Sequence, residues 1–294
     1  MKLLIVADAE GCLNYKVGDA GSARAAMCEE IESIIKNLPS NDISITVVDA
    51  HADGHNLDSL IGIYPHITFI HHIWNLHRFD FDKAAIIGMH SKSQSSSPNA
   101  HTIRNEILDV KMCEESVGEL ELFINLLNYY SIPVFFVSGE KELAHEIKGH
   151  SFITYLYSST DNSVDGMAKA FFTAFKETAE VGKYNGESIR IKLAANIYYE
   201  FIPQTVFPIE QGYLLCDNTL FLFDVLPTLC YALDMAKSFR ASAINRIKQF
   251  IVMNPKQAAH FKEAEKETLI KKADDLSAEE LKALLQRIYA MEEN

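Results

Sequence analysis

Short apolar runs rich in β-branched residues alternate with longer segments of helical periodicity over the first two thirds of the chain. Apolar residues three and four positions apart in 22–38, 117–129 and 164–181 are typical of amphipathic helices. Seven short runs are expected to be strands: 3–7, 43–48, 67–70, 84–88, 134–137, 152–156 and 189–193. The alternation predicts an α/β fold, with a mainly parallel sheet flanked by helices.

The last part of the 294-residue chain has a different composition. From about residue 239 it is rich in Lys, Glu and Ala with helical periodicity, as in 255–272 and 277–291. Ser277 and Glu280 form the sequence pattern of a helix-capping box. We therefore expect a main α/β domain over residues 1–238 and a charged helical C-terminal extension over residues 239–294, whose apolar stripe is suited to docking on another subunit.

Charge and composition limit the partners and the compartment. The chain carries 27 Lys and Arg against 40 Asp and Glu, a net charge of −13. This charge repels polyanions, so we expect neither nucleic acid nor an anionic membrane surface as a partner. The apolar stretch 213–235 is interrupted by Asp217, Asn218, Asp224 and Pro227, which favours a buried helix or strand pair over a membrane span. Five irregularly spaced cysteines and a short N-terminal apolar run favour a cytoplasmic protein with reduced thiols.

Residue types that bind metals follow three of the expected strands. Asp8 and Glu10 come directly after the first run, and their two-residue spacing puts both carboxylates on one side of an extended chain. His51 follows the second run and His90 follows the fourth. Ligands gather at the carboxyl ends of strands in such sheets, so these side chains are expected at one edge. Each signal alone also fits a structural role, such as a turn cap by Asp8 or a hydrogen-bonded histidine.

Two further residues, Glu119 and His101, are candidates for the same site. Glu119 opens an expected helix, where backbone amides stabilise a carboxylate for purely structural reasons as well. His101 lies eleven positions after His90, beyond the Ser-rich segment 91–99, which we interpret as a mobile loop that folds back over the site. Nearby residues of similar type are assigned to turns, packing or the surface: His55, His71, His72, His77 and Cys12.

The candidate ligands provide three carboxylates and two imidazoles: Asp8, Glu10, His51, His90 and Glu119. This mixed nitrogen and oxygen set suits zinc and is large enough for a centre of two metal ions. Two such ions lower the pKa of a bound water and polarise a carbonyl, which leaves His101 to carry protons or to attack. The glycine-rich nucleotide motifs, the G-x-S-x-G elbow and H-E-x-x-H are all absent. A metal-dependent hydrolase is therefore the leading interpretation.

These motifs, in their order and spacing, resemble those of the D-aminopeptidase family of zinc metallopeptidases, the M55 peptidases. The matching segments are Asp8-Ala-Glu10-Gly11, Asp49-Ala-His51, Gly88-Met-His90, His101 and Val117-Gly-Glu119-Leu120, and Val137-Ser-Gly139-Glu140 approximates the family's Val-x-Gly-Asp. The resemblance spans roughly residues 1–235. The chain departs from the family in Cys12-Leu-Asn14, in Thr102, and in Glu121, Leu122 and Phe123 after the last ligand motif.

The resemblance implies two zinc ions per chain, bound by Asp8, Glu10, His51, His90 and Glu119, with His101 as the catalytic residue. It also implies removal of the N-terminal residue from short peptides of D-amino acids, and assembly into ring-shaped, decamer-like homo-oligomers. Two alternatives stay open: a binuclear-metal hydrolase of another small amide or ester, and a non-catalytic metal-bound oligomeric scaffold.

Overall fold

The computed structural model describes residues 1–39, 42–76, 78–158, 163–186, 188–197, 199–253, 261 and 275–292. The chain divides into two compact units, one formed by residues 1–191 and 216–224 and the other by residues 192–215 and 225–294. His77 lies outside the described residues, as does the expected helix at 255–272 apart from residue 261. Position 238, where we expect the main domain to end, lies inside a long helix, and that expected division stays a prediction.

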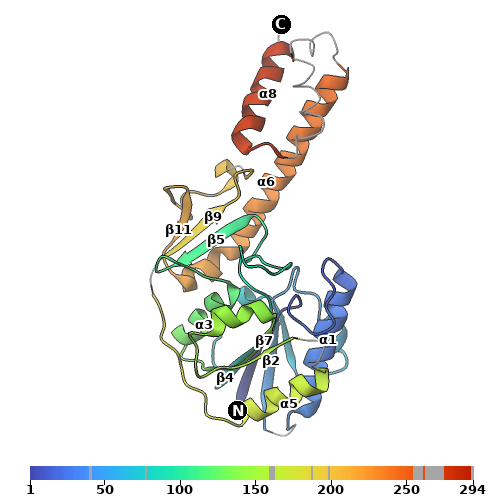
Figure 1. Cartoon of the computed structure of the whole chain (residues 1–294), viewed down its shortest axis with the longest axis vertical. Helices are drawn as coiled ribbons and strands as arrows, with labels where there is room; N and C mark the ends of the chain where they lie inside the picture. Colours follow the sequence, from blue (N-terminus) through green and yellow to red (C-terminus); the bar gives the residue numbers. More distant parts are fainter. Residues whose placement is uncertain are drawn as a thin grey trace. The chain divides into compact units, whose positions relative to one another are not determined.

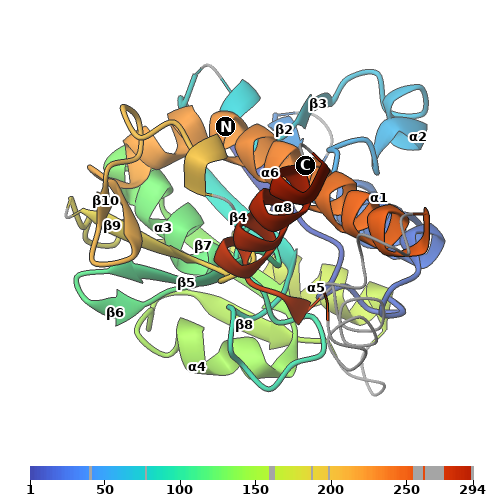
Figure 2. The same cartoon turned by 90° about the horizontal axis from the view of Figure 1, so that it is seen from above.

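A six-stranded sheet forms the centre of the first unit. Its order is β3-β2-β1-β4-β7-β8, and every neighbouring pair is parallel. Figure 2 shows β3 and β8 at its two edges. The strands are β1 (Lys2–Ala7), β2 (Ser44–Asp49), β3 (Thr68–His71), β4 (Lys83–Met89), β7 (Val134–Gly139) and β8 (Thr154–Tyr157). The predicted α/β fold with a parallel sheet is confirmed.

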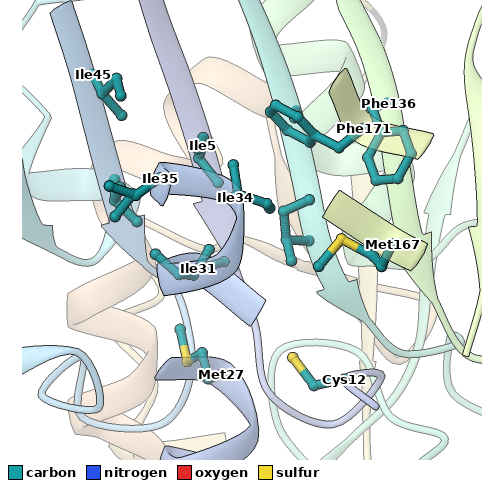
Figure 3. Close-up of a cluster of buried hydrophobic side chains, with 14 of the residues drawn as sticks. Ile5, Cys12, Met27, Ile31, Ile34, Ile35, Ile45, Phe136, Met167 and Phe171 are labelled. Carbon is teal, nitrogen blue, oxygen red and sulfur yellow. The ribbon is translucent and has the colours of Figure 1, made fainter. Parts of the chain in front are cut away.

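Helices cover both faces of this sheet (Figure 1). Helix α1 (Ala20–Asn37) and helix α5 (Val164–Phe175) lie on one face, and α3 (Glu119–Tyr129) lies on the other. The apolar stripe of α1, which includes Ile31 and Ile34, packs with Ile5 of β1, while Phe171 of α5 packs against Phe136 of β7 (Figure 3). Strands covered on both faces are nearly continuous apolar runs, as in residues 3–7.

Shorter elements complete the first unit. They are α2 (Asp58–Ile61), η1 (Ile73–Asn75), β5 (Ile107–Met112), β6 (Glu115–Ser116), η2 (Lys141–Leu143) and α4 (Ala144–Ile147). Strands β5 and β6 pair in an antiparallel manner. The expected strand at 189–193 is β9 (Ile189–Leu193), but it is not part of the six-stranded sheet, so its inclusion in the parallel sheet was wrong. Helix α5 also ends six residues earlier than its periodicity predicted.

The second unit holds most of the C-terminal part. It contains η3 (Tyr199–Phe201) and β10 (Ile209–Glu210), which pairs antiparallel with β11 (Tyr213–Cys216). Helix α8 (Ala278–Glu292) packs Leu281 and Ile288 against Ile247 and Phe250. The predicted capping box at its start is confirmed, because Ser277 and Glu280 exchange hydrogen bonds.

Helix α6 (Thr219–Met253) begins in the first unit and continues in the second. The expected element at 213–235 is therefore a strand followed by the start of this helix. Residues 219–252 are long and apolar enough to cross a membrane by length and composition alone, and an 18-residue window within them has a mean hydropathy of 1.4. Because 44% of that window is buried by the rest of the protein, packing accounts for a large share of its apolar side chains.

Candidate metal centre

The candidate ligands lie beyond the carboxyl ends of the central strands. Asp8 and Glu10 follow β1, His51 follows β2, His90 follows β4, and Glu119 is the first residue of α3. From β1 the chain builds the sheet outward through β2 and β3 and then returns to place β4 on the other side of β1. The point where the strand order reverses is the usual ligand-binding position in such sheets.

Two glycines allow the ends of β1 and β4 to meet. Gly88 has a φ of 70°, and a Cβ there would lie 2.3 Å from the carbonyl oxygen of Asp8. A Cβ on Gly11 would lie 2.0 Å from the carbonyl oxygen of Met89. Both distances are too short for any side chain, so glycine at these positions is what brings Asp8 and His90 to one site.

Asp8, Glu10 and His51 form one group of potential metal ligands. The Nδ1 atom of His51 lies 3.1 Å from Oδ1 of Asp8 and 3.0 Å from Oε2 of Glu10. The loop that carries His51 is braced by Asn56, whose side chain donates to the carbonyl oxygen of His51 and to Asp49. The Nδ1 atom of His51 and one oxygen of each carboxylate therefore face the same small space.

A second group contains Glu10, His90 and His101, so Glu10 belongs to both. The Nε2 atom of His90 lies 3.2 Å from Oε1 of Glu119 and 3.5 Å from Oδ2 of Asp8. Its Nδ1 atom lies 3.0 Å from the carbonyl oxygen of Ser91 and donates to it, which turns Nε2 toward the carboxylates. The His90 side chain is only 2% exposed.

His101 stands slightly apart from the other residues. Its ring stacks on that of His90, with centroids 4.0 Å apart and planes 11° from parallel. Its Nε2 atom lies 3.9 Å from Glu10 and 4.0 Å from Glu119, which is beyond hydrogen-bond distance. Nδ1 donates to the carbonyl oxygen of Asn99 at 2.8 Å. With 18% of its side chain exposed, His101 is the most accessible of the three imidazoles.

The concentration of carboxylates shifts the pKa values of the buried histidines. Burial acts to lower the pKa of His51, but hydrogen bonds to Asp8 and Glu10 outweigh it and raise that pKa to about 10. Burial also acts to lower the pKa of His90, and the Glu119 carboxylate, with Asp8 and Glu10, raises it well above its usual range. For Glu119, burial acts to raise the pKa and the charge of His90 lowers it.

The donor atoms fit a zinc centre. In tetrahedral coordination with zinc-to-ligand distances of about 2.0–2.2 Å, neighbouring ligand atoms lie about 3.4 Å apart. The separations of 3.0, 3.1, 3.2 and 3.5 Å between imidazole nitrogens and carboxylate oxygens are close to that value. Oδ2 of Asp8 is buried and accepts no hydrogen bond within the part of the chain that the structure describes. A buried carboxylate oxygen of this kind gains most from a cation.

Two of the histidines that the sequence analysis assigned to turns, packing or the surface lie in a different place, together with Asp58. His55, Asp58 and His71 approach one another near α2, where Nδ1 of His55 lies 3.1 Å from Asp58. His71 donates its Nδ1 hydrogen to the carbonyl oxygen of Gly54, in keeping with a turn and surface role. Cys12 is buried and its thiol hydrogen-bonds to the carbonyl oxygen of Asp8, while burial raises its pKa well above the usual value. A buried protonated thiol is not a nucleophile.

The residues after the last ligand motif do not simply fill the site. Leu122 and Phe123 are buried, and the ring of Phe123 stacks against Phe223. Glu121 accepts a hydrogen bond from Nε2 of His150 at 2.6 Å. These side chains therefore have partners within the same unit that account for their size and charge.

Sequence reasoning missed the anchoring of the Ser-rich segment. Ser91, Ser93 and Ser97 are buried and hydrogen-bonded, which the sequence did not predict, while the mobility expected for the segment stays a prediction. Much of this bonding ends on Glu140, directly after β7. The only sequence signal for Glu140 was its position in the segment that approximates the family's Val-x-Gly-Asp motif.

Comparisons with known proteins agree with the fold. The zinc-dependent D-aminopeptidase DppA from Bacillus subtilis, described as a self-compartmentalizing protease, has a similar fold, with a TM-score of 0.67 at 18% sequence identity. The similarity covers 80% of this chain and 98% of that one. No curated protein matches the chain. The model of the M55 peptidase family, described as D-aminopeptidase, matches residues 1–180. Because this match covers more than half of the chain, the protein belongs to the M55 peptidase family.

Proposed function

We propose that this protein is a zinc-dependent aminopeptidase that removes N-terminal residues from short peptides, with D-amino acid peptides as its substrates. The observation that carries the proposal is the position of Glu10 in two adjacent groups of ligand atoms. A carboxylate that belongs to two such groups suits a two-metal hydrolase. Membership of the M55 family and the fold shared with a zinc-dependent D-aminopeptidase support the choice of metal and substrate.

In this proposal two zinc ions are held by five side chains: Asp8, Glu10, His51, His90 and Glu119. Zinc supplies Lewis-acid polarisation of the scissile carbonyl and lowers the pKa of a bound water. The buried carboxylates favour a positively charged ligand, so the free ammonium group of a peptide suits the same surroundings. The net charge of −13 favours cationic and neutral peptides over acidic ones in the same way.

His101 is the proposed proton carrier. The carbonyl oxygen of Asn99 holds the hydrogen on Nδ1, so Nε2 is the atom that can accept a proton. Nε2 faces Glu10 and Glu119 without a hydrogen bond to either, and the ring is partly exposed. It is therefore free to take a proton from an attacking water and to return it to the leaving amine.

The test compares His101→Ala with His145→Ala, an exposed histidine on α4 that has no part in the site. Both variants and the parent are assayed on D-alanyl and L-alanyl dipeptides, with metal content measured on the same samples. We expect cleavage of the D-peptides, retention of about two zinc ions per chain, and a loss of 10²-fold or more in kcat for His101→Ala only. Full turnover by His101→Ala with zinc bound would refute the role of this residue.

The same panel separates the alternatives. Cleavage of other amides or esters in place of D-peptides would favour a different binuclear-metal hydrolase. A protein that retains zinc and cleaves none of the substrates would favour the scaffold alternative. Failure to retain metal would refute the catalytic proposal as a whole, because the carboxylates and imidazoles have no comparable chemistry without it.

We also propose that the protein assembles into a ring-shaped, decamer-like homo-oligomer in the cytoplasm. The structural neighbour is described as self-compartmentalizing, which supports an assembly of this kind. None of the five cysteines forms a disulfide within the described residues, which agrees with a reducing compartment. Light scattering coupled to gel filtration tests the assembly, and a monomer at micromolar concentration would contradict it.

A further inference from the structure

The segment between His90 and His101 returns to its own starting point. The backbone amide of His101 donates to the carbonyl oxygen of Ser91 at 3.3 Å. The two imidazole rings at its ends stack at 4.0 Å. Whatever fixes the ends of this segment therefore also fixes the relative position of the two rings.

The carboxylate of Glu140 lies between the two ends of the segment. Its Oε2 atom accepts hydrogen bonds from the backbone nitrogen of Ser91 at 3.1 Å and from the hydroxyl of Ser91 at 2.7 Å. Its Oε1 atom accepts from the hydroxyl of Ser97 at 2.6 Å and from the side-chain amide of Asn99 at 2.7 Å. One oxygen thus holds the start of the segment and the other holds its end.

Each end is in turn bonded to one of the histidines. The carbonyl oxygen of Ser91 accepts from Nδ1 of His90 at 3.0 Å, and the carbonyl oxygen of Asn99 accepts from Nδ1 of His101 at 2.8 Å. The Asn99 side chain also donates to the carbonyl oxygen of Glu10. Glu140 itself is fixed, because its backbone nitrogen donates to the carbonyl oxygen of Met89 and its carbonyl oxygen accepts from the hydroxyl of Tyr155.

We propose that Glu140 is a positioning residue that clamps both ends of the 91–99 segment and so aims the Nε2 atoms of His90 and His101 at the metal centre. Among the described residues, its carboxylate forms no hydrogen bond or ion pair with a candidate ligand side chain or with His101, and it acts through Ser91 and Asn99. The clamp rests on hydrogen bonds within this chain and does not depend on the proposed activity. Only its consequence for turnover rests on the proposed function.

The chemistry of the site requires a carboxylate at this position. Four hydrogen-bond donors converge on two oxygens, and an ionised carboxylate has only acceptor positions. Glutamine has the same shape, but its NH₂ group would face donors that it cannot accept from. Glu140→Gln therefore opens one end of the clamp while it leaves the volume of the side chain almost unchanged.

The experiment compares Glu140→Gln with Glu142→Gln, which removes the same charge two residues along the chain from a side chain outside the clamp. Amide hydrogen exchange is measured on the metal-free proteins, peptide by peptide. We expect exchange in residues 90–103 to rise at least tenfold in Glu140→Gln and to stay at the parent level elsewhere, with no change in Glu142→Gln. A parent-like exchange pattern in Glu140→Gln would overturn the proposal, as would a uniform rise across the whole chain.

Steady-state kinetics of the zinc-loaded proteins give the second measurement. Loss of a residue that orients ligands and their partners typically costs 10- to 100-fold in activity, and we expect this loss in kcat with KM nearly unchanged. A change in KM alone would contradict a positioning role. If exchange changes as expected while the parent cleaves no peptide, the clamp stands and the proposed function fails.

Asn99→Ala provides a second variant should Glu140→Gln not fold. It removes the bonds to Oε1 of Glu140 and to the backbone of Glu10, and it leaves the Ser91 end intact. Faster exchange is then expected around His101 but not at residues 90–92. Equal loosening at both ends would contradict the separate roles of the two carboxylate oxygens.

Discussion

Zinc uptake by the metal-free protein should release protons, and their number follows from the geometry of the centre. His51 Nδ1 faces Asp8 and Glu10, and His90 Nε2 faces Glu119 and Asp8. With a pKa of about 10, His51 is almost fully protonated at pH 7, and the pKa of His90 is also raised well above its usual range. Zinc binds only the neutral imidazole, so binding must displace these protons.

Loss of the His51 proton has a free-energy cost that weakens zinc binding. Removing a proton at pH 7 from a group with a pKa of about 10 costs about 4 kcal/mol, at 1.36 kcal/mol per pH unit. The apparent dissociation constant is then weaker at pH 7 by about 10³-fold from this residue alone. When both histidines contribute, the apparent affinity should rise about 100-fold for each pH unit above 7, until His51 loses its proton.

Calorimetric titration of the metal-free protein with zinc, in buffers of different ionisation enthalpy at pH 7, counts the released protons. We expect about two per chain for the parent and about one fewer for His51→Ala. His145→Ala, on exposed α4, should behave as the parent. Zinc binding without proton release, or release that is unaltered in His51→Ala, would refute the assignment of these nitrogens as ligands.

Three further predictions concern stability. The folded pKa of His51 lies above its unfolded value of 6.5, so its contribution to the unfolding free energy is fully present below pH 6.5 and is lost as the pH rises to about 10. Urea unfolding of the metal-free protein should therefore show that the unfolding free energy falls by at most about 5 kcal/mol over this range. A pH profile of stability that His51→Ala leaves unchanged would contradict this prediction. Gly88→Ala should lower the unfolding free energy by about 1–3 kcal/mol because of its positive φ and the nearby Asp8 carbonyl, and a thermal midpoint equal to the parent's would argue against this close approach. Asp19 accepts hydrogen bonds from the backbone amides of residues 21 and 22 at the start of α1. Asp19→Ala should therefore lower the unfolding free energy measured in urea by about 1 kcal/mol, while Asp19→Asn should lower it little. Equal losses in both variants would show that the charge of Asp19, and not its capping hydrogen bonds, stabilises the helix.

The parallel sheet was predictable because its signals are local. A strand buried on both faces has to be apolar along its whole length, and residues 3–7 show this directly in the sequence. The candidate ligands follow from the same logic, since residues that come after parallel strands share one edge of the sheet. The positions of Asp8, His51 and His90 after three parallel strands were therefore enough to predict that they meet.

The strand at 189–193 shows the limit of local signals. Its composition predicted a strand correctly, but no local feature states which sheet a strand joins. Pairing depends on partners far away in the chain, and β9 is not a member of the six-stranded sheet. The Ser-rich segment shows the same limit. A run of small polar residues has the same sequence pattern whether its hydroxyls face solvent or donate to buried acceptors such as Glu140.

By itself, the sequence determined the fold class, the edge of the sheet at which the candidate ligands meet, and the residue types available there. Only the tertiary structure decided that Glu10 belongs to two groups of potential metal ligands, that His101 stacks on His90, and that Glu140 holds both ends of the segment between them. The physical reason is the sequence separation over which each interaction acts. Apolar periodicity acts between neighbours in sequence, whereas the bonds from Glu140 to Ser91 and Asn99 join residues 49 and 41 positions apart, and only the packed chain brings such partners within reach.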